Sequence, residues 1–282
     1  HHIPGSLQEK MKDSLVHGMA FMNDQEVSNT IYSHGIMGAR WKDFAPELHD
    51  CLRSNTVRCY GNMIAQGVSN TIYGMGLMGA GWHSMGLDYQ YCTLEAVIKT
   101  LGTADHEASL QGSPSPAGAG APGSSVSSKD NFKSTPRRTA AYGGTSPQAV
   151  ANIIYSLGVV GAQWREFPGQ VKSAIFQGLR AYGHRLSSQE ISNVVYGLGL
   201  LRCDYASLPP EIVDTLTVNL DRVATRRAAR DGESDDKASS GSAGGSLNQQ
   251  EVCATLHGFA KMNAEWGQMS EALKFTLLSC IS

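Results

Sequence analysis

The residues best suited to chemistry are pairs of asparagine and tyrosine that recur along the chain. In each pair the Asn precedes the Tyr by three residues, so on a helix both side chains lie on one face. Amide groups hydrogen-bond the edges of unpaired nucleobases, and tyrosine rings stack on those bases. Four copies of the pair occur: Asn29 and Tyr32, Asn70 and Tyr73, Asn152 and Tyr155, and Asn193 and Tyr196.

The same pairs also fit a purely structural role. A buried Asn must be hydrogen-bonded, and stacked identical units could satisfy it in the same way each time. Identity between copies favours this structural ladder over base recognition, because a base-reading code must vary from unit to unit. A fifth copy has Ala254 and His257 in these places, so the pair can be lost.

Positions that vary between copies are better candidates for reading an RNA sequence. We expect them on the helix face opposite the apolar stripe of Val27 and Ile31. In the alternative interpretation, the glutamates cap helices and the small residues admit a neighbouring helix. The candidates are Glu26, Thr30, Ser33, Thr71, Ser156, Glu190 and Thr255.

Arginines are candidates for contacts with RNA phosphates, namely Arg58, Arg180 and Arg185. The alternative is that they are ordinary solvated surface residues. The chain has 23 Lys and Arg against 25 Asp and Glu, a net charge of −2. This balance excludes the strongly basic composition of many nucleic-acid-binding proteins but allows a local basic stripe.

The elements that position these residues belong to a block that occurs five times. The copies start at Gln25, Gln66, Gln148, Gln189 and Gln250, so the starts lie 41, 82, 41 and 61 residues apart. Each copy reads as two helices: the first begins at a capping residue and the second at a proline. The pattern predicts an all-α fold, an α-solenoid of two-helix repeats with a 41-residue period. The capping residues are Asn23, Ser146, Ser187 and Asn248.

Two inserts divide the predicted solenoid. Residues 103–145 are rich in Gly, Ser, Pro and Ala, and residues 225–247 are charged and then rich in Gly and Ser, so we predict both to be disordered. Residues 1–102 then hold a half repeat and repeats 1 and 2, residues 146–224 hold repeats 3 and 4, and residues 248–282 hold repeat 5. The opening half repeat favours a segment of a longer array.

Motifs of catalysis are missing from the sequence. Gly74, Gly76 and Gly79 match the dinucleotide-binding pattern G-x-G-x-x-G, but that pattern needs a preceding strand, and here it falls within a predicted helix. The nine histidines lack metal-ligand spacing, and the six cysteines form no C-x-x-C pair. We therefore expect no cofactor, no bound metal and no enzymatic activity. Since the sequence has no apolar run of about 18 residues, we also expect no membrane span.

Small residues inside the first helix of each repeat predict a close approach between neighbouring helices. Glycine in a helix interior costs roughly 1 kcal/mol relative to alanine, so its recurrence needs a compensating contact. The glycines at this position are Gly35, Gly76, Gly158 and Gly199.

The repeated pattern Q-x-[VI]-[SA]-N-x-[IV]-Y-[GS]-x-G, followed by an aromatic residue and then P-P-E or A-P-E, resembles the octotricopeptide repeat. It is similar also to the related heptatricopeptide and FAST-kinase-like repeats, whose P-P-P-E-W signature is echoed at residues 208–212 and 44–48. The resemblance implies helical hairpins that bind single-stranded organellar RNA, ribosomal RNA included. It further implies a mitochondrial or plastid ribonucleoprotein, acting in transcript stability, processing or translation.

A protein-binding scaffold without nucleic-acid binding is the alternative function. RNA binding predicts Lys and Arg along the inner face of the solenoid and an affinity that depends steeply on salt. A scaffold predicts an apolar or acidic groove and an affinity that salt changes little.

Overall fold

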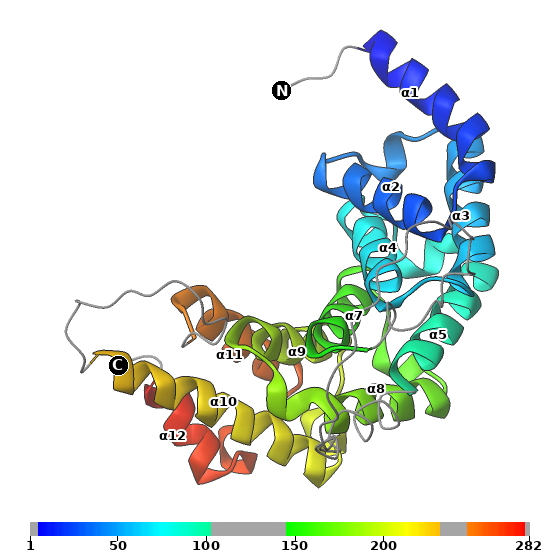
Figure 1. Cartoon of the computed structure of the whole chain (residues 1–282). Coiled ribbons are helices and arrows are strands. Elements are labelled where there is room, and N and C mark those ends of the chain that lie inside the picture. Colours follow the sequence, from blue (N-terminus) through cyan, green and yellow to red (C-terminus); the bar gives the residue numbers. More distant parts are fainter. Residues whose placement is uncertain (1–4, 103–144, 232–246, 280–282) are drawn as a thin grey trace, which may run out of the picture.

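The computed structural model describes residues 5–102, 145–231 and 247–279. Within these ranges every regular element is a helix and none is a strand, so the predicted all-α class is confirmed. The helices form a repeat-like arc of two layers (Figure 1). No helix in the described ranges combines the length and the apolar character that crossing a membrane requires.

The inner layer lines the concave side of the arc, and the outer layer lies behind it (Figure 1). The inner helices are α2 (Asp24–Ile36), α4 (Ala65–Leu77), α7 (Pro147–Val159), α9 (Ser188–Leu200) and α11 (Gln249–Lys261). The outer helices are α1 (Gly5–Gly18), α3 (Pro46–Tyr60), α5 (Leu87–Gly102), α8 (Gly169–Tyr182), α10 (Pro210–Asp231) and α12 (Glu271–Ser279).

The inner helices begin where the sequence predicts. The side chains of Asn23, Ser187 and Asn248 each accept a hydrogen bond from the backbone N–H three residues later, where a Glu carboxylate accepts one from the capping residue in return. This capping box satisfies two backbone donors that the helix leaves free. Ser146 caps α7 in the same way without a Glu partner.

Each inner helix ends in a left-handed residue, which stops the helix and turns the chain outward. Gly38, Gly79 and Gly161 take this conformation with φ of 76°, 75° and 85°. Arg202 and Asn263 take the same conformation, with φ of 56° and 55°. A residue with a Cβ atom adopts this conformation less readily than glycine does.

A backbone hydrogen bond joins each inner helix end to the next. The N–H of Trp41 donates to Met78 O at 2.7 Å, that of Trp82 to Val160 O at 2.9 Å, and that of Trp164 to Leu201 O at 2.7 Å. A fourth bond runs from Tyr205 N–H to Met262 O at 2.9 Å. Because these bonds link equivalent positions, the inner helices run parallel, and their C-terminal ends share one edge of the arc.

The predicted close approach of inner helices is confirmed. A Cβ atom built on Gly35 would lie 2.8 Å from the backbone oxygen of Gly74, and one on Gly158 would lie 2.6 Å from the Cβ of Leu200. A Cβ on Gly199 would lie 2.5 Å from the oxygen of Gly258. Real Cβ contacts do not come this close, so glycine sets the spacing between repeats.

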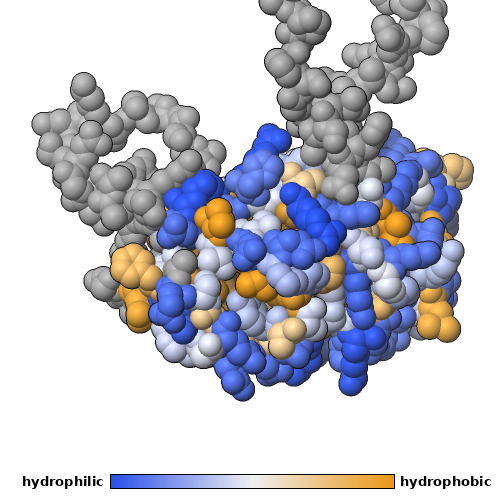
Figure 2. All heavy atoms as spheres, turned by 90° about the horizontal axis from the view of Figure 1, so that it is seen from below, coloured by the Kyte–Doolittle hydropathy of each residue, from blue (hydrophilic) through white to orange (hydrophobic). Residues whose placement is uncertain are grey.

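The core lies between the two layers, whereas the far side of the outer layer is mainly hydrophilic. Val27 and Ile31 of α2 and their counterparts on α4, α7 and α9 are fully buried in this core. Figure 2 views the arc from below and shows apolar side chains in small separate groups among hydrophilic ones. Exposed apolar residues on α10 and α12 include Val218, Phe275 and Leu278.

The second predicted insert begins too early. We expected disorder from residue 225, but α10 continues to Asp231. The Ala and Arg residues of this stretch are strong helix formers, which explains the longer helix. Most of the first insert lies outside the described residues; at its end, the Thr145 hydroxyl donates to Thr100 O at 2.6 Å.

Candidate functional site

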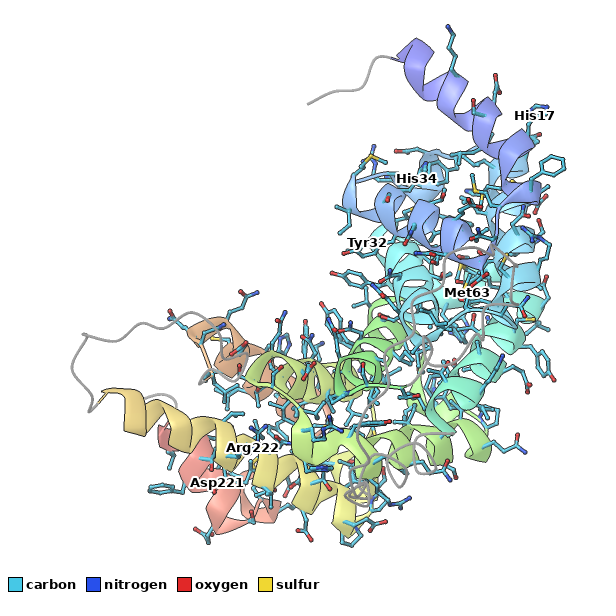
Figure 3. All side chains as sticks on the ribbon, in the orientation of Figure 1. His17, Tyr32, His34, Met63, Asp221 and Arg222 are labelled. Atoms are coloured by element: carbon cyan, nitrogen blue, oxygen red, sulfur yellow. The ribbon has the colours of Figure 1, made fainter. Side chains whose placement is uncertain are left out.

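Four of the described inner helices, α2, α4, α7 and α9, turn the same three kinds of side chain toward the inner side of the arc. Gln, Asn and Tyr follow one another after four and three residues, and with about 3.6 residues per turn they fall on one face. That face is opposite the buried Val27 and Ile31, and Tyr32 lies on the concave side in Figure 3. We call these residues the inner stripe: Gln25, Asn29 and Tyr32; Gln66, Asn70 and Tyr73; Gln148, Asn152 and Tyr155; and Gln189, Asn193 and Tyr196.

The tyrosine rings of the inner stripe form one continuous row. Ring centroids lie 6.3 Å apart between Tyr32 and Tyr73, 5.8 Å between Tyr73 and Tyr155, and 6.1 Å between Tyr155 and Tyr196. His257 of α11 extends the row at 5.4 Å from Tyr196. Since these are contact distances for aromatic pairs, a planar ligand would lie over the row rather than between two of its rings.

The inner stripe is uncharged on α2, α4, α7 and α9. Partial burial, followed by the neighbouring phenols, raises the pKa of Tyr73 and of Tyr155 above the ordinary value of about 10. These two rings therefore stay neutral at physiological pH, as amides do. The lysines and arginines that RNA binding predicted for the inner face are absent from the stripe on these four helices.

The asparagine amides of the inner stripe have no hydrogen-bond partner within the described part of the chain. Asn29 is exposed, while Asn70, Asn152 and Asn193 are half-buried. The outer helices show what a structural Asn does here: the amide of Asn55 on α3 donates to Cys51 O at 2.9 Å and accepts a hydrogen bond from Arg58. Among the described residues the asparagines therefore show no hydrogen-bonded ladder, and their donors and acceptors are available to a ligand.

A groove between α2 and α4 is lined by stripe residues of both helices. Its volume is about 390 Å³, within the usual range of ligand sites of about 300–1,000 Å³. It is open partly because α4 has Gly67 where α9 and α11 have a glutamate. Two amides from each helix line this one groove, whose full lining is Asp24, Gln25, Ser28, Asn29, Ile64, Gln66, Gly67 and Asn70.

The variable face predicted to read RNA is instead the contact between repeats. Thr71, Ser156 and Thr255 are buried, with exposed fractions of 0%, 1% and 0%, so no base can reach them and their predicted exposure is wrong. The reason is that this face of each inner helix packs on the inner helix before it. A Cβ on Gly74, for example, would lie 2.7 Å from Ile31 O.

The remaining candidates of this face have two different positions. Glu26 and Glu190 cap α2 and α9, as the alternative interpretation proposed. Thr30 is half-buried and Ser33 is exposed, because no inner helix precedes α2 among the described residues. Glu26 and Thr30, together with Asn29, line a wide, shallow surface depression.

The predicted phosphate-binding arginines Arg58 and Arg180 are engaged within the protein. Arg58 of α3 donates to Met19 O at 3.1 Å and to Met22 O at 2.9 Å, so it ties α3 to the preceding turn. Arg180 forms an ion pair with Glu211 at 2.5 Å on the outer layer. The guanidinium of Arg58 thus has a structural role, which the sequence reasoning did not consider. Arg185 is exposed in the turn between α8 and α9.

A set of cations that the sequence reasoning missed lies at the C-terminal edge of the inner layer. None of these cations has a carboxylate partner among the described residues. His83, which follows α4, takes the place that Lys42 and Arg165 have in their repeats, and it lies 3.6 Å from Glu166. Asp204 and Glu265 lie on the same edge. The signal was a cation near the C-terminal end of an inner helix in four repeats out of five, although not at one fixed position. Lys261 is the last residue of α11, and Arg202 lies two residues after α9. Lys42 and Arg165 each follow the tryptophan that begins the next short helix. The name edge cations is used below for the four members of this set, which are Lys42, Arg165, Arg202 and Lys261.

The glycine pattern that resembles a dinucleotide-binding motif is explained by packing. Gly74 and Gly76 face neighbouring inner helices, and Gly79 is the left-handed residue after α4. No group of three or more potential metal ligands occurs in the described ranges. The chain matches no protein-family model and no curated protein sequence.

Proposed function

We propose that the chain is an α-solenoid with a 41-residue period, whose inner stripe binds single-stranded RNA. One observation carries the proposal: a row of partly exposed tyrosine rings runs beside asparagine amides that have no partner in the described residues. Rings that stack and amides that hydrogen-bond are the groups that recognise unpaired bases. The resemblance to octotricopeptide repeats supports the same ligand and leads us to propose mitochondrial or plastid RNA, ribosomal RNA included.

A single strand fits this surface better than a duplex. The rings are spaced by 5.8–6.3 Å, whereas bases in a duplex rise by about 3.4 Å. Bases presented once per repeat must therefore be drawn apart, which only an unpaired strand allows. With the bases over the uncharged stripe, the phosphates would follow the edge cations.

Because the inner stripe is uncharged, the expected salt dependence of RNA binding is modest, not steep as the sequence alone predicted. Four edge cations can neutralise at most four phosphates, so log Kd should change with log salt concentration with a slope no steeper than about 3 in magnitude. Fluorescence polarisation with a labelled random RNA 12-mer, at several salt concentrations, measures this slope. Charge-reversal of Arg165 and Arg202 to Glu should flatten it, whereas Arg180→Glu on the outer layer should leave it unchanged. A slope twice as steep would place the RNA on another surface.

Removal of two stripe amides should weaken RNA binding without destabilising the protein. We expect Asn152→Ala/Asn193→Ala to raise Kd for RNA at least fivefold, since each lost hydrogen bond contributes about 0.5–1.5 kcal/mol. The melting temperature should change by less than about 2 °C, because no internal hydrogen bond is lost. The matched control is Gln170→Ala/Ser173→Ala on the exposed side of α8. Equal affinities of the two double variants would contradict the proposal.

An extended peptide is the second candidate ligand, and the absence of charge on the inner stripe favours it. Two residues of an extended chain span about 6.6 Å, close to the spacing of the tyrosine row. Asparagine amides can bond the main chain of such a peptide in every repeat. Failure to bind any RNA at low salt would select this protein-binding role over the first proposal.

A further inference from the structure

The inner stripe is the same on four successive inner helices. Gln, Asn and Tyr occupy the same three positions on α2, α4, α7 and α9. Of the residues that do vary, Thr71, Ser156 and Thr255 are buried between repeats and cannot reach a ligand. Each of the four repeats therefore offers a bound strand the same donors, the same acceptors and the same ring.

Resting on the proposed function, we infer that the inner stripe recognises a run of one base, and that this base is adenine. Repeat proteins that read a mixed sequence vary the two or three side chains that face each base. Here those side chains do not vary, so all four repeats must prefer the same nucleotide. Identity between repeats then indicates a repetitive ligand rather than a structural role.

The amide groups favour adenine among the four bases. An Asn or Gln side chain carries a donor and an acceptor side by side, and it pairs with the N6 amino group and N7 of adenine through two hydrogen bonds. Asn29, Asn70, Asn152 and Asn193 are free to do so, since no described residue occupies their amides. Adenine also offers two fused rings to the exposed part of each tyrosine.

The fifth inner helix limits the length of the run. On α11, Ala254 replaces the Asn and His257 replaces the Tyr, although Gln250 is retained. The ring row continues through His257, 5.4 Å from Tyr196, but the amide is lost. A nucleotide over α11 can therefore stack without being selected, and the specific run is four bases long.

The test measures how the affinity of the whole chain depends on the number of adenines. Labelled cytidine 10-mers that carry two, three, four or five consecutive adenines are titrated by fluorescence polarisation. We expect the affinity to rise about fivefold or more with each cytidine replaced by adenine up to four, the scale on which one bidentate Asn–adenine pair discriminates against another base. A fifth adenine should add less than twofold.

Variants tie the preference to the stripe. Asn152→Ala/Asn193→Ala should lower the preference for four adenines over cytidine at least tenfold, whereas Gln170→Ala/Ser173→Ala should keep it. The double substitution Ala254→Asn/His257→Tyr places Asn and Tyr on α11 as well. In this variant the affinity should continue to rise up to five adenines instead of four. This gain-of-specificity variant keeps the test meaningful even where a loss of binding reflects a local structural change.

The outcomes separate this inference from the proposed function. Equal binding of all RNA 10-mers, mixed sequences included, would overturn the adenine run while leaving RNA binding intact. A preference for uridine or cytidine 10-mers would overturn the assignment of adenine. Absence of binding to every RNA would reject the proposed function itself, together with the inference that rests on it.

Discussion

Replacing Gly199 with alanine is expected to destabilise the contact between α9 and α11 by about 1–2 kcal/mol. The new methyl group would lie 2.5 Å from Gly258 O and 2.8 Å from Gly258 Cα. Neither backbone atom can rotate away, so the two helices must move apart. Overpacking of this kind costs about 1–3 kcal/mol, and the better helix propensity of alanine recovers up to about 1 kcal/mol of it.

Thermal denaturation and hydrogen exchange measure this effect. We expect the melting temperature to fall by about 3–6 °C. Relative to the unsubstituted protein, amide exchange should become faster in α11 and α12 and change less in α2. Local loosening is expected because each repeat of such an array contacts only its neighbours. The control is Gly169→Ala at the start of α8, where a Cβ would meet nothing within 4 Å. A Gly199→Ala protein as stable as the control would show that the repeats tolerate wider spacing.

Helix ends and helix spacing could be predicted from the sequence because single residues determine them locally. A capping residue followed by a glutamate three residues later predicts the start of a helix, as at Asn23, Ser187 and Asn248. Glycines at one recurring position inside a helix predict that a neighbouring helix packs closely there. Glycine destabilises a helix interior relative to alanine, and a close helix contact is what compensates for that. Such signals need no knowledge of where the neighbour lies.

The faces of the inner helices could not be assigned in this way. Hydrophobic periodicity shows which side of a helix is buried, but a helix within a stack has three packed sides: one toward the outer layer and one toward each neighbour. Thr71 and Thr255 are polar and variable, as surface residues are, yet they lie between two helices. Only Gln, Asn and Tyr remain on the fourth side.

The roles of the arginines could not be predicted from the sequence either, because a long side chain can hydrogen-bond to groups far away in the sequence. Arg58 bonds to oxygens of Met19 and Met22, 39 and 36 residues earlier. Its counterpart Arg222 on α10 donates to Leu186 O in the same manner. Recurrence of a cation at this position, with Lys99 of α5 bonding Gly61 O, was the signal that could have revealed a structural role.

The largest effect on RNA binding is expected from Tyr155, the ring in the middle of the row. Tyr155→Leu keeps an apolar side chain between Tyr73 and Tyr196 but removes the aromatic face. Stacking of one base on an aromatic side chain contributes about 1–3 kcal/mol, so the Kd for RNA should rise by about 5- to 150-fold. Tyr155→Phe should bind within twofold of the unmodified protein, because the Tyr155 hydroxyl has no hydrogen-bond partner in the described ranges.

Comparison of Tyr, Phe and Leu at position 155 distinguishes the effect of the ring on stability from its effect on RNA binding. Each aromatic contact contributes about 0.5–1.5 kcal/mol to stability, and Tyr155 makes two, at 5.8 Å and 6.1 Å. Tyr155→Leu should therefore lower the melting temperature by several degrees as well, and binding must be measured well below that temperature, where circular dichroism shows the variant folded. If folded Tyr155→Leu binds RNA as tightly as Tyr155→Phe, the tyrosine row only holds the repeats together, and the amides alone must account for any recognition.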